Sequence, residues 1–166
     1  MPERTGYLGL GSNVGDSEGH LHAALQLLPT QGVQIVPVSS TWVTEPVGEI
    51  LDQPDFLNAA ARVRTPLEPE ELLDACKAVE AERGRSFEAA RHSPRPLDVD
   101  LLLLGDLELE TERLTLPHPE VRSRRFVLVP LLELDPELTL PDGTRLADCL
   151  AALPEGEQRV ERRGSL

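Results

Sequence analysis

The segment RPLDVDLLLLGD, residues 95–106, combines a run of four leucines with two aspartates. Its leucine and valine side chains are typical of a buried β-strand, so we expect this segment to form a central part of the fold. Asp98 and Asp100 are two residues apart, so on a strand they project from the same face, with Cα atoms about 6.5–7 Å apart. Because unpaired carboxylates are very unfavourable in a core, we expect this pair to face water, an arginine or a metal ion.

Helices and strands are expected on both sides of this segment, without a regular alternation between them. Hydrophobic periodicity and turn residues predict strands at 6–12, 33–44 and 56–65, and helices within 15–30, 65–85 and 140–153. For residues 114–138 the periodicity does not decide between helix and strand. This order indicates an α+β fold, with a ferredoxin-like core and helices packed on an antiparallel-rich sheet in αβα layers.

Two local patterns predict the faces of one strand and the start of one helix. In the predicted strand at 56–65, the odd-numbered residues from Leu57 to Val63 are expected on one face, and the even-numbered residues, including Asn58, on the other. Thr65 and Glu68 have the spacing of a capping box, which predicts the start of the following helix.

Length and composition favour one domain over residues 1–166. The chain is 40% hydrophobic and 27% charged, with a formal net charge of −13. This charge repels polyanions, so we expect neither nucleic acid nor a membrane surface as a partner. The first residues lack a basic head followed by an apolar run, and Cys76 and Cys149 lie in apolar segments. A cytoplasmic protein with two buried, reduced thiols is therefore expected.

Positive charge is concentrated in two short segments of this acidic chain. Seven of the 16 lysine and arginine residues fall there: Arg83, Arg85, Arg91 and Arg95 in the first segment, and Arg122, Arg124 and Arg125 in the second. One interpretation is a solvated surface. The other is a local site for a compact anion such as a nucleotide polyphosphate, which arginine side chains bind through two parallel hydrogen bonds.

The aspartate pair also has two interpretations. Mg²⁺ prefers oxygen ligands and takes carboxylates together with phosphate oxygens, and two adjacent carboxylates can hold a pair of such ions in phosphoryl transfer. Alternatively, Asp98 and Asp100 pair with arginines at a strand edge.

Other residues admit both a structural and a functional interpretation. The segment GLGSN, residues 9–13, is either a strand-to-helix turn or a phosphate cradle, although it lacks the Lys-Ser/Thr that completes a P-loop. His118 lies between two prolines and either contacts phosphate or packs. Phe56 and Phe126 are either core residues or the two sides of a site for a flat heterocycle.

Four motifs carry the most specific functional signal. They are LGLGSNVGD at 8–16, DQPDFLNAA at 52–60, RHSPRPLDVDLLL at 91–103 and LTLPHPEVRSRRFVLVPL at 114–131. In this order and spacing they resemble the 6-hydroxymethyl-7,8-dihydropterin pyrophosphokinase family of folate biosynthesis. The resemblance extends from Gly6 to about Gly143.

This resemblance implies a transfer of pyrophosphate, in which the hydroxymethyl oxygen of the pterin attacks the β-phosphorus of ATP and AMP leaves. It implies two Mg²⁺ ions, held by Asp98 and Asp100, and the small molecules ATP and 6-hydroxymethyl-7,8-dihydropterin as substrates. We also expect the protein to be a monomer. Arg85 and Arg95 match the arginines that neutralise charge building on the phosphates.

The resemblance also implies where each substrate binds. The residues that match its ATP site are Lys77, Glu80, Arg95, Arg113, Thr115, His118 and Arg124. Those that match its pterin site are Thr44, Val47, Phe56, Asn58 and Phe126. The loops 45–55 and 84–94 match segments that close over the substrates. Two rival functions remain from the residues alone: another Mg-dependent phosphoryl or nucleotidyl transferase on a ferredoxin-like fold, and a non-catalytic acidic binding domain.

Overall fold

The computed structural model describes residues 3–13, 15–44, 55–83, 96–154 and 160–166. Within them, an antiparallel six-stranded sheet consists of β1 (Arg4–Ser12), β2 (Gln34–Val38), β3 (Thr41–Thr44), β4 (Phe56–Thr65), β5 (Asp98–Leu104) and β8 (Val160–Gly164). A separate hairpin consists of β6 (Leu109–Glu110) and β7 (Thr115–Leu116). The helices are α1 (Ser17–Leu27), α2 (Pro69–Glu82), α3 (Arg125–Leu134) and α4 (Leu146–Ala152), with short 3-10 helices η1 (Leu28–Gln31) and η2 (Pro119–Arg122).

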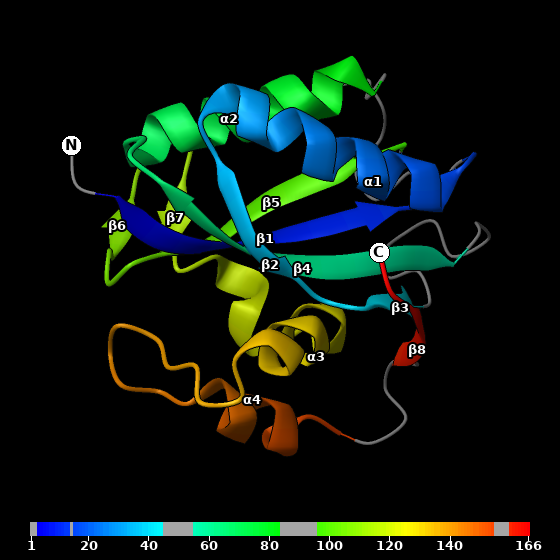
Figure 1. The fold of residues 1–166 in the computed structure, drawn as a ribbon. Helices are drawn as coiled ribbons and strands as arrows, with labels where there is room; N and C mark the ends of the chain where they lie inside the picture. Colours follow the sequence, from blue (N-terminus) through cyan, green and yellow to red (C-terminus); the bar gives the residue numbers. More distant parts are fainter. Residues whose placement is uncertain (1–2, 14, 45–54, 84–95, 155–159) are drawn as a thin grey trace.

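The helices form two layers around the sheet. Helices α1 and α2 cover one face, and α3 and α4 lie on the other (Figure 1). The strands have the order β5-β1-β4-β3-β8, and β2 also pairs with β4. With β1 and β4 in the centre, and with β2 and β3 counted as one interrupted strand along β4, the chain order from β1 to β5 is β-α-β-β-α-β, which is a ferredoxin-like arrangement. The predicted α+β class with helices on an antiparallel sheet is confirmed.

Each face of the sheet carries its own hydrophobic cluster. The odd-numbered residues of β4 from Leu57 to Val63 belong to the cluster that includes α1 and α2. Ala60, one of the even-numbered residues, belongs instead to the cluster with Leu128 and Leu131 of α3. The alternation predicted for this strand is therefore confirmed, and it places Asn58 on the face that α3 covers.

The single strand predicted at 33–44 is wrong, because the chain forms two strands there. Strands β2 and β3 pair with β4 one after the other, and the register changes between them. At the break, the backbone N–H of Ser39 donates to the carbonyl of Ala60 at 2.8 Å, and the Ser39 hydroxyl accepts from the N–H of Ala60 at 2.9 Å. The Ser39 side chain thus replaces a backbone group in one hydrogen bond between the strands. A hydrophobic pattern does not reveal such a replacement.

Helix α2 begins three residues later than the predicted capping box implies. Its N-cap is Glu68, whose backbone N–H donates to the Glu71 carboxylate at 2.9 Å in a reciprocal pair. Thr65 instead donates its hydroxyl to the carbonyl of Gly32 at 2.8 Å. Pro69 lacks a backbone N–H and suits the first helical position, so the helix starts there.

The last third of the chain mixes short elements. Residues 114–138, for which the sequence did not decide between helix and strand, contain β7, η2 and α3. Helix α4 confirms the helix predicted within 140–153. Strand β8 was not predicted, because its sequence VERRG has a single apolar side chain; it pairs with β3 at the edge of the sheet.

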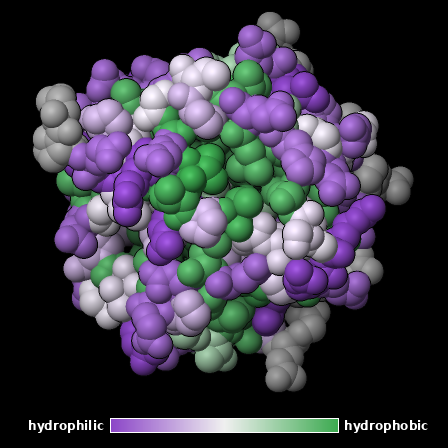
Figure 2. All heavy atoms as spheres, in the orientation of Figure 1, coloured by the Kyte–Doolittle hydropathy of each residue, from purple (hydrophilic) through white to green (hydrophobic). Residues whose placement is uncertain are grey.

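The surface beside β2 is the most apolar part of the view in Figure 2. Hydrophobic side chains gather near the middle of this view, in the region where Figure 1 shows β2 in front. An open groove of about 360 Å³ here includes Leu25, Val33 and Ile35 in its lining.

The longest helix, α2, has 14 residues, so no helix in the described ranges reaches the length and apolarity of a membrane span.

Candidate metal and nucleotide site

Asp98 and Asp100 lie on β5, the strand at one edge of the sheet. Asp98 is paired with Gly11 of β1 and Asp100 with Gly9, so both side chains project from the same face, as predicted. The opposite edge of β5 faces α2. There the Glu80 carboxylate accepts the backbone N–H of Val99 at 2.8 Å. Glu80 is buried, with 3% of its surface exposed, and this hydrogen bond satisfies one of its oxygens.

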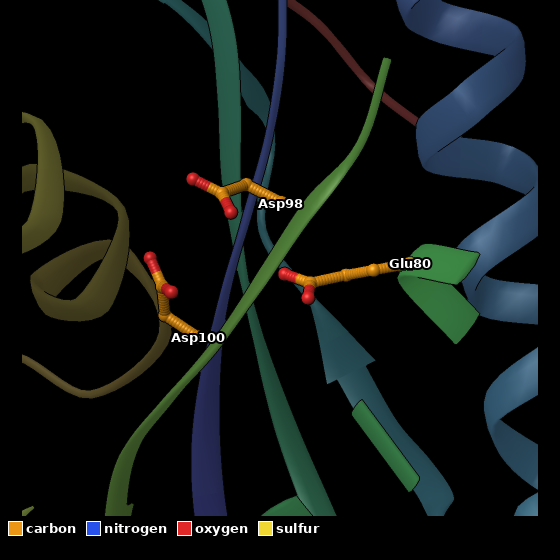
Figure 3. Close-up of side chains that lie close together, drawn as sticks. All are labelled: Glu80, Asp98 and Asp100. Carbon is orange, nitrogen blue, oxygen red and sulfur yellow. The ribbon is translucent and has the colours of Figure 1, made fainter. Parts of the chain in front are cut away.

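Glu80, Asp98 and Asp100 form a three-carboxylate cluster at this edge. Figure 3 shows the two aspartates projecting from one side of β5 and Glu80 approaching the strand from α2 on the other. Each residue offers one oxygen, and these three oxygens lie within 4.8 Å of one another. Asp98 is half-buried and Asp100 exposed, so the cluster opens from the protein interior towards solvent. Such a set of oxygen donors fits a hard cation such as Mg²⁺, which neutralises their mutual repulsion.

A cavity of about 280 Å³ adjoins the carboxylate cluster. Its walls come from the last turns of α2, from β5, from the segment that links β6 to β7, and from the start of η2. It brings together seven residues predicted from the sequence: Lys77, Glu80, Asp98, Asp100, Arg113, Thr115 and His118. The cavity therefore combines cationic, hydroxyl and imidazole groups with the carboxylates, as a site for an anion bound together with a divalent cation requires.

His118 is held in one orientation by its backbone and by its ring. Its backbone N–H donates to the carbonyl of Leu102 in β5 at 2.9 Å, and its Nδ1 accepts from the N–H of Glu120 at 3.1 Å. Burial lowers the pKa of His118, although Glu120 and Asp98 act in the opposite direction. The ring is therefore neutral at pH 7. Because Nδ1 accepts a hydrogen bond, the proton is on Nε2, which makes this nitrogen a donor for an anionic ligand.

Arg113 and Arg124, two arginines predicted for the ATP site, lie in different places relative to the cavity. Arg113 lines the cavity and donates to Asp74 at 2.6 Å and to Glu70 at 3.3 Å, both on α2. The hydrogen bond and charge of Asp74 raise its already high pKa. Arg124 precedes α3 and pairs with Glu120 at 3.7 Å, and it is not among the described residues that line the cavity.

Cys76 lies next to the site but is chemically inert. It is fully buried on α2, and burial raises the pKa of its thiol to about 12, with smaller contributions from Glu80 and Asp100. The neutral thiol is neither a metal ligand nor a nucleophile at pH 7. Cys149 is half-buried and also free, so the prediction of two buried thiols is correct for Cys76 alone.

The predicted pterin residues lie on the other side of Asp98. Within the sheet, Gly11 of β1 is paired with both Asp98 of β5 and Asn58 of β4. Directly paired residues share a face, so Asn58 and Asp98 project from the same face, one strand apart on either side of Gly11. Thr44 is buried and accepts from Asn58 Nδ2 at 2.6 Å. Phe56 is paired with Thr44 and is half-buried.

Phe126, the second predicted aromatic residue, is half-buried in the first turn of α3. It is thus on the helix that covers the Asn58 face of the sheet. Val47, Arg85 and Arg95 lie outside the described residues. The loop 84–94 also lies outside them, as does the loop 45–55 apart from Asp55.

Residues 9–13 include a glycine with a specific role in the sheet. Residues 9–12 belong to β1, so the strand predicted at 6–12 is confirmed and these residues are not a turn. A Cβ atom placed on Gly11 would lie 2.7 Å from Asn58 Oδ1, closer than real contacts allow. Gly11 is therefore required for the close approach of the Asn58 side chain, and the sequence contained one hint of it: a glycine inside a strand often marks such an approach.

Comparisons with known proteins point to one family. Residues 7–136 match the family model described as 7,8-dihydro-6-hydroxymethylpterin-pyrophosphokinase. A 2-amino-4-hydroxy-6-hydroxymethyldihydropteridine pyrophosphokinase from Pseudomonas aeruginosa is 43% identical over 158 residues, which cover 93% of this chain and 95% of the relative. A protein of the same name from Methylorubrum extorquens is 45% identical over 157 residues, covering 93% and 98%.

A solved structure agrees with this family at the level of the fold. It is described as HPPK-DHPS in complex with substrates, and it matches with a TM-score of 0.71 and 12% identity. The match covers 92% of this chain but 43% of the other, so this chain spans less than half the length of that protein.

Proposed function

The chain belongs to the 7,8-dihydro-6-hydroxymethylpterin-pyrophosphokinase family, and from this membership we propose that it transfers pyrophosphate from ATP to 6-hydroxymethyl-7,8-dihydropterin at the cluster of Glu80, Asp98 and Asp100. One observation carries the proposal. The cluster lies between a cavity with groups that suit a polyphosphate and a sheet face that bears the predicted pterin residues.

The carboxylate cluster would hold Mg²⁺, and we propose two ions. When bound, Mg²⁺ supplies Lewis-acid stabilisation of the charge that develops on the phosphates. Asp98 and Asp100 lie on one strand face, and Glu80 is fixed by its hydrogen bond to the backbone of β5, so the donors are oriented before any ligand arrives. This preorganisation avoids a cost of rearrangement during the reaction.

The cavity beside the cluster would bind the triphosphate of ATP. His118 would donate from Nε2 to a phosphate oxygen, and Lys77 and Arg113 would contribute positive charge. Thr115 adds a hydroxyl. Arg124, Arg85 and Arg95 remain part of the proposal through the family resemblance alone.

The pterin would bind on the other side of Asp98. Its hydroxymethyl oxygen attacks the β-phosphorus, and the bond from this phosphorus to the oxygen that bridges to the α-phosphate breaks. AMP leaves with that oxygen, and the hydroxyl proton passes to solvent. Asn58 would hydrogen-bond the polar edge of the ring, and Phe56 and Phe126 would stack on its faces.

The experiment measures AMP release from ATP with and without the pterin, for the wild-type chain and for Asp98→Asn and Asp100→Asn. Both variants should lose at least about 100-fold in turnover, because each removes a charge that holds the metal. Excess chelator should abolish the wild-type activity. Asp106→Asn is the matched control, since this exposed aspartate lies just beyond β5, and its activity should be unchanged.

Three results would contradict the proposal. AMP release that does not need the pterin would favour another Mg-dependent transferase. Full activity in excess chelator would exclude the metal. No AMP release under any condition would favour a binding domain. The monomeric state and the cytoplasmic location stay predictions from the sequence, and size-exclusion chromatography tests the first.

A further inference from the structure

The side-chain amide of Asn58 is constrained at both of its ends. Asn58 is buried, and its Nδ2 donates to Thr44 Oγ1 of β3 at 2.6 Å. Its Oδ1 lies on the opposite side, over Gly11 of β1. The nitrogen end of the amide therefore faces β3, and the oxygen end faces β1 and the strand of the carboxylates beyond it.

Gly11 determines the position of the oxygen end. An ideal Cβ on this residue would lie 2.7 Å from Asn58 Oδ1 and 3.8 Å from Cγ of the same side chain. Its next nearest neighbour, the carbonyl oxygen of Leu57, is 4.0 Å away. A methyl group at position 11 thus clashes with the amide alone, and the amide relieves the clash by rotating away.

We propose that Gly11 and Thr44 are positioning residues for pterin binding: Gly11 leaves the space over which the Asn58 amide oxygen lies, and Thr44 holds the amide nitrogen. This inference rests on the proposed function, because it assigns Asn58 the polar edge of the pterin. An amide with a fixed orientation presents its acceptor and its remaining donor in a defined order, and so selects a ring edge with the complementary order.

The location of Gly11 gives this constraint a second consequence. Gly11 is paired with Asp98 as well as with Asn58. Adjacent strands are about 4.8 Å apart, so the Cα atoms of Asn58 and Asp98 are about 10 Å apart. Because the Asn58 amide extends over β1, its oxygen lies closer to the carboxylates on β5 than the backbone of β4 does. A ring bound to this amide therefore has its reactive arm within reach of the metal site.

The main test compares Gly11→Ala with Gly9→Ala. Both glycines lie on β1 and on the same face, but the nearest atoms to a Cβ on Gly9 would be side-chain atoms of Leu102, at 3.5 Å or more, which is an ordinary contact. Calorimetry would measure the Kd for 6-hydroxymethyl-7,8-dihydropterin in the presence of Mg²⁺ and α,β-methylene-ATP, which cannot release AMP. Gly11→Ala should raise this Kd at least tenfold and leave the Kd for α,β-methylene-ATP within twofold, and Gly9→Ala should change neither.

A double variant shows whether Gly11 acts through Asn58. Asn58→Ala alone should weaken pterin binding, and adding Gly11→Ala should then have little further effect, because no amide remains to be displaced. Thr44→Val should weaken pterin binding in the same manner, whereas Thr44→Ser, which keeps the hydroxyl, should retain it. The Thr44 pair keeps the proposal testable if Gly11→Ala does not fold.

Normal pterin binding by folded Gly11→Ala would overturn the proposal, and so would an equal loss in Thr44→Ser and Thr44→Val. A large additional loss in the double variant would show that the glycine acts by another route, and would also overturn it. Failure of the proposed function is a different result: in that case the wild-type chain itself neither binds the pterin nor releases AMP.

Discussion

At the scale of single residues, Glu80 combines a structural and a chemical role. Its carboxylate accepts the N–H of Val99 and is one of the three clustered carboxylates. Glu80→Gln keeps an acceptor for that N–H, so the free energy of unfolding should change little, while the affinity for Mg²⁺ falls with the lost charge. Glu80→Ala leaves the N–H buried without a partner and should destabilise the protein by about 1–3 kcal/mol.

Urea denaturation and Mg²⁺ titration of both Glu80 variants separate the two roles. If Glu80→Gln binds Mg²⁺ as tightly as the wild-type chain, the buried glutamate is a structural residue only, and Asp98 and Asp100 alone would hold the metal.

Ser12 and Ser39 are both buried but differ in their hydrogen bonds, so comparing them measures how much a hydroxyl without a partner costs in stability. Ser12 Oγ is fully buried, and no described residue is its hydrogen-bond partner. Ser39 is equally buried, but its hydroxyl donates to the carbonyl of Ser40 at 2.7 Å and accepts from Ala60. Ser12→Ala should therefore be neutral or stabilise the protein by up to about 1 kcal/mol, and Ser39→Ala should destabilise it by about 1–3 kcal/mol.

Chemical denaturation of the two alanine variants measures this difference. Equal losses of stability would mean that the Ser12 hydroxyl has a partner, such as a bound water, in solution.

At the scale of secondary-structure elements, Glu133 ties α3 to the sheet. Its carboxylate accepts from the Ser40 backbone N–H at 3.0 Å, the Ser40 hydroxyl at 2.7 Å and Trp42 Nε1 at 2.9 Å. Burial alone would raise the pKa of Glu133, but these hydrogen bonds and the nearby Arg162 outweigh it and lower the pKa. The charged carboxylate is thus favoured in the folded state.

This lowered pKa predicts a specific pH dependence. A group with a depressed pKa stabilises the fold above its unfolded pKa, here the ordinary 4.5, and the contribution is lost as the pH falls through the lower folded value. Glu133→Gln should cost about 1 kcal/mol at pH 7, because the carboxylate is exposed, and the cost should shrink below pH 4.5.

Thermal melts from pH 7 down to about pH 3 check this, with Glu137→Gln as the control. Glu137 is an exposed carboxylate with one ion pair, to Arg145 at 3.4 Å, so its loss should cost about 0–0.5 kcal/mol. A pH-independent cost of Glu133→Gln would show that shape and not charge matters at this contact.

The sequence predicted those elements whose side chains follow a regular period. Strand β4 was predicted with the observed ends and faces, because apolar residues occupy every second position from Leu57 to Val63. The break between β2 and β3 depends on hydrogen bonds between Ser39 and Ala60 of β4, which no local period encodes. The cap of α2 was placed wrongly because Thr65 and Glu68 have the same spacing as the real capping pair, Glu68 and Glu71, while Thr65 donates to Gly32 in another segment. Strand β8 is charged, and only the edge of β3 makes it a strand.

At the scale of the whole molecule, the sequence predicted which residues form the candidate site, but not how they are arranged in space. The spacing of Asp98 and Asp100 indicated a shared face, and the family resemblance supplied Glu80, Lys77 and His118. The close approach of Glu80 to the backbone of β5 depends on how α2 packs along the sheet edge. The link from Asn58 through Gly11 to Asp98 depends on strand register, which joins three segments far apart in the chain.

The net charge predicts how salt affects the stability of the whole molecule. Acidic side chains outnumber basic ones by 29 to 16, so like charges repel one another at pH 7. Raising NaCl from about 10 mM to about 150 mM shortens the Debye length from about 30 Å to about 8 Å and screens this repulsion. We expect the Tm to rise by about 2–4 °C, which corresponds to about 1 kcal/mol.

The same titration near the pI of about 4.7 is the control, with chelator present so that stray divalent cations do not contribute. There the net charge is close to zero, and salt mainly weakens exposed ion pairs such as those of Arg113 and Arg122. The Tm should then stay constant or fall slightly. A fall at pH 7 would mean that the ion pairs outweigh the net repulsion, and that the excess acidic charge is dispersed widely enough not to destabilise the fold.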